Sequence, residues 1–191
     1  MKKIAVLVED HYQVLEVWYP YLRLREEGFN TVLVGTGKKE YKSKEGYPAY
    51  PEVSIKDVKA DDFDGVIIPG GYAPDILRRY EEVNNFVRNL NKKNKLVAAI
   101  CHAGWVLVSA GVLKNKKATS FSAIKDDVVN AGAKFLDKEV VVDGNLITSR
   151  NPYDLPAFSR EIIRFLKGLP TDREVCLRGE KEMSEEDLGQ R

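Results

Sequence analysis

The sequence holds 191 residues, enough for one domain with a sizeable hydrophobic core. Its 30 Lys and Arg residues nearly balance its 29 Asp and Glu residues, and no basic block stands out, so we expect no nucleic acid as the main partner. The opening MKKIAVLVEDHY meets acidic residues too early for a signal peptide, and no apolar run is long enough to cross a membrane.

The predicted elements begin with a hydrophobic strand over residues 3–8. A helix over residues 14–27 follows, with its apolar side chains on two neighbouring stripes, and Gly28 ends it. Pro20 lies inside this helix and lacks the N–H that would bond to the carbonyl of Glu16. We therefore expect the helix to bend near Glu16.

The rest of the chain alternates between short strands and helices. Strands are predicted over residues 31–34, 64–68, 96–100 and 118–121, and helices over residues 81–91, 103–110, 125–131 and 154–166. A further helix is expected to open at residues 73–75. A polar hairpin is expected within residues 38–50, and a second one around Asp143-Gly144-Asn145, which joins strands 139–142 and 146–148.

This alternation predicts an α/β fold in which a mostly parallel sheet is covered by helices on both faces. Ligands of such sheets bind at the carboxyl ends of the strands. Gly70, Gly71 and Cys101 fall at strand carboxyl ends, and Glu16 follows the first strand closely. These residues are therefore expected to lie close together.

The domain is predicted to cover residues 1–168. Residues 169–191 are polar and highly charged, and we interpret them as a C-terminal extension. Within this extension, Ser184 with Asp187 would suit the cap of a short helix.

Residues 95–111 (KLVAAICHAGWVLVSAG) hold the most reactive candidate side chain, Cys101. An apolar strand turns directly into a small-residue helix there, and the residue at such a turn is strained and stands clear of the sheet. The small residues Ala99, Ala103 and Gly104 leave room for the bend. A thiol above a helix N-terminus is expected to have a pKa below the ~8.5 of free cysteine. The alternative is that Cys101 is a small buried apolar residue.

Other residues near the strand ends could assist a nucleophile. His102 could move protons if the bend folds it beside Cys101, with Asp75 as one candidate acid to orient it. Gly70 and Gly71 could present backbone N–H groups to an oxyanion, although a Gly-Gly pair is usually only a turn. Glu16 would share a proton with Cys101 if the two touch, but from the sequence alone it is more simply a solvated helix acid. No metal site is expected, since His11 with its acidic neighbours is a poor candidate.

Six segments together resemble the ThiJ/PfpI superfamily, and most closely its intracellular protease subfamily, the PfpI type. They span nearly all of residues 1–167 in the family's order: EVWYP (16–20), IPGGYAP (68–74), AICHAG (99–104), SAGVL (109–113), KDDVVNAG (125–132) and VVVDGNLITSR (140–150). The resemblance implies a flavodoxin-like three-layer sandwich of the class I glutamine-amidotransferase type.

The resemblance also implies roles for single residues. Cys101 would be the nucleophile, Glu16 the carboxyl next to its sulfur, and the backbone N–H groups of Gly71 and His102 the oxyanion site. In the protease-like members, His102 pairs with an acid from a neighbouring subunit of a hexamer built as a trimer of dimers, and that acid matches Asp75, where the family usually has Glu. The sequence departs from its relatives at two more positions, because His11 and Gln13 replace acids.

We therefore predict a cofactor-free cysteine hydrolase of the intracellular protease type, in which Cys101 attacks a carbonyl of a peptide or similar substrate. The first alternative is a glyoxalase or protein deglycase that acts on methylglyoxal or its adducts. The second is a redox-sensing or chaperone-like stress protein. A homo-oligomer is expected, as a hexamer or a dimer. A cytoplasmic location is expected because a thiolate enzyme needs a reducing compartment.

Overall fold

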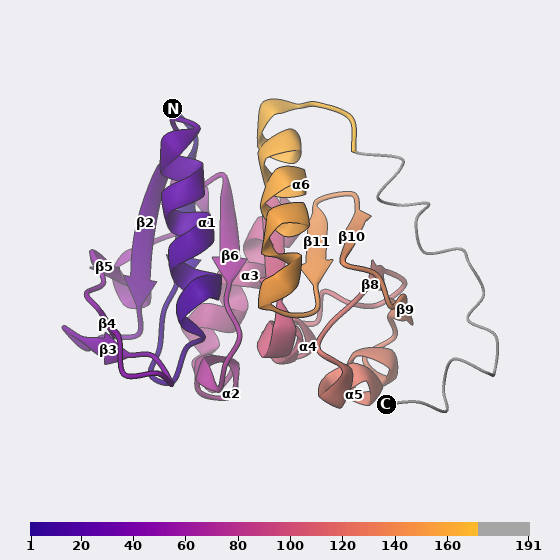
Figure 1. Cartoon of the computed structure of the whole chain (residues 1–191), viewed down its shortest axis with the longest axis horizontal. Helices are drawn as coiled ribbons and strands as arrows, with labels where there is room; N and C mark the ends of the chain where they lie inside the picture. The colour runs from indigo at the N-terminus through magenta and orange to yellow at the C-terminus, as the bar shows by residue number, and fades with distance from the viewer. Residues whose placement is uncertain (172–191) are drawn as a thin grey trace.

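The computed structural model describes residues 1–171, and a seven-stranded sheet forms the centre of this part of the chain (Figure 1). The strand order is β10-β11-β7-β6-β1-β2-β5, and every neighbouring pair is parallel except β10 with β11. The strands are β1 (Lys3–Leu7), β2 (Asn30–Gly35), β5 (Val53–Ser54), β6 (Gly65–Ile68), β7 (Leu96–Ile100), β10 (Val140–Asp143) and β11 (Leu146–Ser149).

Helices cover the sheet on both faces (Figure 1). On one face, α1 (Val14–Glu26) packs on β1 and β2 and against α6 (Leu155–Lys167), which covers β7, β10 and β11. On the other face, α3 (Glu81–Lys92) and α4 (Gly104–Ala110) pack on β6 and β7 and against each other. The shorter helices α2 (Ala73–Leu77) and α5 (Lys125–Asn130) contact α4. These layers confirm the predicted flavodoxin-like α/β fold.

Two small pairs of strands lie outside the main sheet. The antiparallel pair is β3 (Tyr41–Lys42) with β4 (Pro48–Ala49), and the parallel pair is β8 (Lys117–Ala118) with β9 (Lys134–Phe135). Single turns of 3-10 helix complete the described part of the chain, at Ile55–Asp57, Ala60–Asp62, Cys101–Ala103, Ser122–Ile124 and Pro152–Asp154.

The inner strands are buried on both faces, which explains why they are continuous apolar runs in the sequence. Every residue of β6 and β7 is buried. The register places Ile68 beside Ala99, and Ile100 beside Ser149, so the carboxyl ends of β6, β7 and β11 meet at one edge of the sheet. The loops that carry the candidate site residues leave the sheet at this edge.

The structure differs from the sequence-based predictions in a few local features. The strand predicted at residues 118–121 is only Lys117–Ala118, because the next backbone N–H, that of Thr119, donates to the side-chain oxygen of Thr148 instead of to a strand. The strands β5 and β9 are two residues long and show no alternating pattern, so the sequence did not indicate them. The helix α1 continues through Pro20 as one element, as predicted, and the bend expected near Glu16 stays a prediction.

The predicted domain boundary lies where α6 ends. Gly168 adopts a left-handed conformation (φ 69°) and forms the C-cap of this helix. The cap predicted from Ser184 and Asp187 lies outside the described residues. Across residues 1–171, every helix is too short or too polar to cross a membrane.

Gly65 is expected to be intolerant of any side chain, because it faces Leu96 across the centre of the sheet. An added Cβ would lie 2.5 Å from the Leu96 Cβ and 3.0 Å from its carbonyl oxygen. Gly65→Ala should therefore lower the free energy of unfolding by about 1–3 kcal/mol in chemical denaturation. Gly104→Ala is the comparison, because its nearest atom is the terminal methyl of Ile124 at 2.9 Å, which can move aside. An equal or larger loss in Gly104→Ala would contradict this account.

Candidate active site

Cys101 forms the turn between β7 and α4 with a left-handed backbone (φ 63°). Within residues 1–171, the other non-glycine residues with positive φ are His11, Asn94 and Asn115, and asparagine tolerates this conformation far better than cysteine does. Such strain amounts to about 1–3 kcal/mol and persists only where the surroundings enforce it. The predicted elbow is therefore present, with Cys101 at its tip and 7% exposed.

Gly70 is what allows the site groups to meet. A Cβ on this residue would lie 2.7 Å from the Cys101 Cβ, 2.7 Å from Oε2 of Glu16 and 3.1 Å from the backbone nitrogen of His102. Gly71 has a φ of 76°, and its own Cβ would clash with the backbone of the segment before α1. The Gly-Gly pair therefore does more than form a turn. The missing side chain of Gly70 leaves room for Cys101 and Glu16, and that of Gly71 leaves room for the backbone of the loop before α1.

Glu16 lies at the start of α1 and is completely buried. Its Oε2 accepts a 2.7 Å hydrogen bond from the backbone N–H of Gly70, and its carboxyl also bonds to the Cys101 side chain. Its Oε1 is buried without a hydrogen-bond partner. The simpler sequence interpretation, a solvated helix acid, is wrong, because the tertiary fold places the first turn of α1 against the Gly70 loop.

Cys101 and Glu16 act on each other's protonation. Burial raises the pKa of Glu16 to about 7, against the lowering effect of the Gly70 and Cys101 hydrogen bonds. Burial and the Glu16 carboxylate raise the pKa of the Cys101 thiol to about 12, and the backbone N–H groups of His102 and Gly71 oppose this. The sequence-based expectation of a lowered thiol pKa is therefore wrong. It took account of the helix N-terminus but not of burial or of the charge of Glu16, which both raise the thiol pKa.

His102 lies beside Cys101. Its Nδ1 is 3.3 Å from the Cys101 Sγ, so the bend folds these neighbours together. The imidazole stacks on Phe121, with ring centroids 4.8 Å apart, and meets the edge of Trp105 at 5.3 Å. Burial and then the positive charge of Lys44 lower the His102 pKa, so the ring is neutral at pH 7 and able to accept a proton.

The backbone N–H groups of His102 and Gly71 both point to the Cys101 sulfur. A carbonyl oxygen of a substrate bound at that sulfur would meet these donors, which are the two that the family resemblance implies for an oxyanion. The aromatic residues Trp105 and Phe121 and the cation Lys44 were not among the predicted site residues. Two signals were available, because Trp105 follows His102 by one helical turn and Phe121 ends a predicted strand.

Asp75 is not part of this cluster within one chain. Its side chain is 48% exposed on α2, and its carboxylate forms an ion pair with Arg79 one turn later. Across the part of the chain that the structure describes, no carboxylate forms a hydrogen bond or ion pair with His102. The role of Asp75 as an acid for a neighbouring subunit stays a prediction.

His11 and Gln13 position the loop that precedes α1. The backbone N–H of His11 donates to the Lys42 carbonyl at 2.7 Å, and its carbonyl accepts from Tyr72 at 2.9 Å. The Gln13 side chain accepts a hydrogen bond from the Glu16 N–H at 3.0 Å and so caps α1. Residues 1–171 contain no group of three or more His, Cys, Asp or Glu side chains that could hold a metal ion.

Glu16→Gln should lower the pKa of the Cys101 thiol by about one pH unit or more, because the substitution removes the adjacent negative charge and leaves an amide that can donate to the thiolate. The alkylation rate by iodoacetamide, measured on wild type and variant from pH 6 to above the wild-type pKa of about 12, would show the shift. An unchanged or higher midpoint in the variant would contradict the coupling of the two groups.

The buried Glu16 should also make stability depend on pH. Its pKa is raised from 4.5 to about 7, so the folded state holds the proton more tightly than the unfolded chain, and the free energy of unfolding should fall as the pH rises between these values. Between pH 5 and 7.5 the loss relative to Glu16→Gln should be roughly 2 kcal/mol. Chemical denaturation of both proteins at the two pH values tests this, and parallel curves would exclude it.

Known proteins share this architecture. The chain matches the DJ-1/PfpI family over residues 2–165. It is 41% identical over 165 residues to "Deglycase PfpI" of Pyrococcus furiosus, and the match covers 86% of this chain and 99% of that relative. It is also 41% identical over 167 residues to "Putative cysteine protease YraA" of Bacillus subtilis, where the match covers 87% of this chain and 99% of the relative. A two-domain protein from Anabaena variabilis, with DJ-1/ThiJ/PfpI-like and ferritin-like domains, superposes with a TM-score of 0.86 at 39% identity; the match covers 97% of this chain and 52% of that one. The chain belongs to the DJ-1/PfpI family.

Proposed function

We propose that the protein converts 2-oxoaldehydes such as methylglyoxal, free or released from their adducts, into 2-hydroxy acids, which is the glyoxalase or deglycase chemistry. The observation that carries this proposal is the fully buried Glu16 carboxyl bonded to the Cys101 thiol. With a pKa of about 7, this carboxyl can take and return protons near neutral pH. The reaction needs a carboxyl of this kind, because a proton must move between two carbons of the substrate.

The proposed reaction balances without a cofactor. The Glu16 carboxylate takes the proton of the Cys101 thiol as the sulfur adds to the aldehyde carbon, and passes it to the aldehyde oxygen, so that a neutral hemithioacetal forms with this oxygen against the N–H groups of Gly71 and His102. Glu16, a carboxylate again, removes the hydrogen from that carbon and returns it to the neighbouring carbon. The hydroxyl proton of the hemithioacetal passes to the neighbouring oxygen, which gives a thioester of the 2-hydroxy acid. Water, with its proton accepted by the neutral His102, hydrolyses the thioester and frees the thiol.

The named relatives support the same chemistry. The relative from Pyrococcus furiosus is named a deglycase, and so are relatives from Pyrococcus abyssi and Thermococcus kodakarensis at 39% and 41% identity. We propose a cytoplasmic location, because a reducing compartment would keep Cys101 free.

Peptide hydrolysis is the second candidate, and the 3.3 Å approach of His102 to the Cys101 sulfur favours it. The Bacillus subtilis relative, named as a putative cysteine protease, supports it as well. This reaction would need an acid to orient His102, which we assign to Asp75 of a neighbouring copy in a dimer or hexamer. The ion pair between Asp75 and Arg79 would have to open, and this requirement places peptide hydrolysis second.

Turnover of methylglyoxal to lactate is the direct test. Wild type should be active, Cys101→Ser should be inactive, and Glu16→Gln should lose about 10²-fold or more in kcat because the carbon-to-carbon proton transfer lacks its base. The exposed Lys92→Met should match wild type. Full activity of Glu16→Gln would exclude the proposed role of the carboxyl, and peptide cleavage without methylglyoxal turnover would establish the second candidate instead. Turnover of neither substrate would favour a binding or redox role.

Asp75→Ala separates the two candidates. Peptide hydrolysis should fall about tenfold or more if a neighbouring Asp75 orients His102, whereas methylglyoxal turnover should change little. Light scattering at micromolar concentration gives the oligomeric state in parallel. A fully active monomer would exclude the shared acid.

A further inference from the structure

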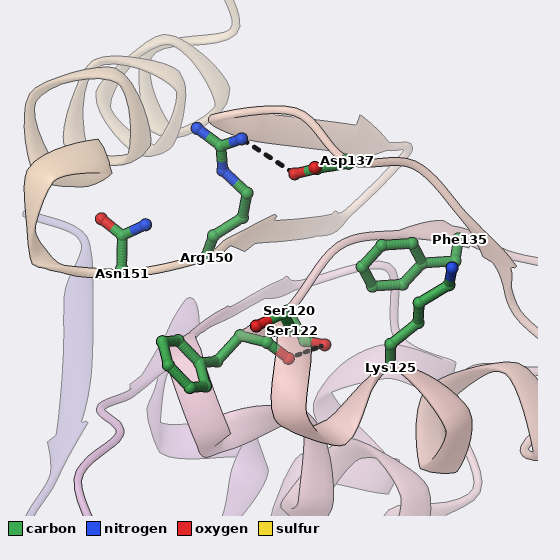
Figure 2. Close-up of a pocket in the computed structure, with 8 residues that line it drawn as sticks. Ser120, Ser122, Lys125, Phe135, Asp137, Arg150 and Asn151 are labelled. Atoms are coloured by element: carbon green, nitrogen blue, oxygen red, sulfur yellow. Dashed lines mark hydrogen bonds and ion pairs between the residues drawn. The ribbon is translucent and has the colours of Figure 1, made fainter. Parts of the chain in front are cut away.

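A cavity of about 640 Å³ lies next to His102 and belongs to no part of the reaction centre described above. Phe121 connects the two, because its ring stacks on His102 while the same residue lines the cavity. Figure 2 shows this cavity. Its lining residues are Ser120, Phe121, Ser122, Lys125, Phe135, Asp137, Arg150 and Asn151.

The fold brings this cavity to the same sheet edge as the nucleophile. Ser149, the last residue of β11, lies beside Ile100, the last residue of β7, so Arg150 and Asn151 leave the sheet next to Cys101. On the other wall, the backbone N–H of Phe121 donates to the Cys101 carbonyl at 3.2 Å. Phe121 is therefore the residue that a substrate attached to the sulfur would extend past to reach the cavity.

The two cations in the cavity wall, Arg150 and Lys125, differ in whether a carboxylate pairs with them. Arg150 bonds through Nε and a terminal nitrogen to the buried Asp154, and through its other terminal nitrogen to Asp137 at 2.8 Å. These contacts raise the pKa of Arg150 and occupy its guanidinium. Lys125 differs, because its ammonium lies 5.6 Å from the ring centroid of Phe135 and pairs with no carboxylate within residues 1–171.

Asp137 is an acceptor in the wall, 73% exposed, and its carboxylate and that of Asp154 share the guanidinium of Arg150. The other polar groups of the wall add donors. The Asn151 side-chain oxygen accepts from the Tyr153 N–H at 3.0 Å, which leaves its amide N–H₂ available. The hydroxyl of Ser122 is exposed at the cavity wall. Figure 2 shows Asn151 and Lys125 on opposite walls with Ser122 between them. The cavity therefore offers one unpaired cation and several donors to a ligand with acceptor oxygens.

We infer that this cavity binds a carboxylate on the non-reacting part of the substrate, with Lys125 as its charged partner and Ser122 and Asn151 as donors. One unpaired cation matches the single charge of a carboxylate. This inference rests on the proposed function and narrows its substrate class to 2-oxoaldehydes that carry a carboxylate several atoms from the reacting carbonyl. The substrate atoms between the reacting carbonyl and the carboxylate would lie along Phe121.

A matched pair of aldehydes tests the selectivity. Wild type should prefer 4-carboxyphenylglyoxal to phenylglyoxal in kcat/KM, and Lys125→Met should reduce this preference by about 5–10-fold, mainly through KM for the charged substrate. Lys92→Met is the control, because Lys92 is exposed at the end of α3, remote from the cavity lining, and should retain the wild-type preference. A preference that Lys125→Met leaves intact would overturn the inference.

A binding measurement separates this inference from the proposed reaction. Calorimetry with 4-acetylbenzoate, which carries the carboxylate but no aldehyde, should show binding to wild type and Lys92→Met and at least about fivefold weaker binding to Lys125→Met. Acetophenone, the neutral analogue, should not distinguish the three proteins. If neither aldehyde is turned over, the proposed function fails, and the calorimetry with 4-acetylbenzoate alone decides whether the cavity binds a carboxylate. Undetectable binding of 4-acetylbenzoate to wild type, or equal binding to all three proteins, would overturn the inference.

Discussion

The close approach of Gly70 to Cys101 and Glu16 is the contact on which the site depends. Three segments meet there: the end of β6, the turn after β7 and the first turn of α1. A single methyl group on Gly70 would push them apart, because it would lie 2.7 Å from both the Cys101 Cβ and the Glu16 carboxylate. The hydrogen bond from Gly70 to Glu16 exists only because of this spacing.

This arrangement lowers the stability of the fold and perturbs the pKa values of Cys101 and Glu16. A left-handed cysteine is strained, and a buried carboxyl without a partner for one oxygen is poorly solvated. The neighbouring strands β6 and β7 are fully buried and supply the packing that enforces both features. Burial brings two acidic groups into one site and raises the pKa of both, and the Glu16 carboxylate raises the pKa of Cys101 further. Such perturbed pairs are typical of catalytic centres.

His102 divides the edge of the sheet into two regions with different tasks. On one side lie the sulfur, the carboxyl and the two oxyanion donors, which form the reaction centre. Behind Phe121 lies the polar cavity with its unpaired Lys125. In the proposed function the reaction centre needs only a carbonyl from its substrate, and the carboxylate site that we infer in the cavity would discriminate among carbonyl compounds.

The sequence by itself determined the class of fold and the position of Cys101 at a sharp strand-to-helix turn, because both depend on local patterns. Apolar runs alternating with amphipathic helices predict a buried parallel sheet, and the small residues around Cys101 predict a sharp bend. Only the tertiary structure decided the state of Glu16 and the direction of the thiol pKa, since burial and the meeting of residues 16, 70 and 101 arise from contacts between segments far apart in the chain. The same holds for the cavity, where the free cation is recognised only after Arg150 is seen to be paired.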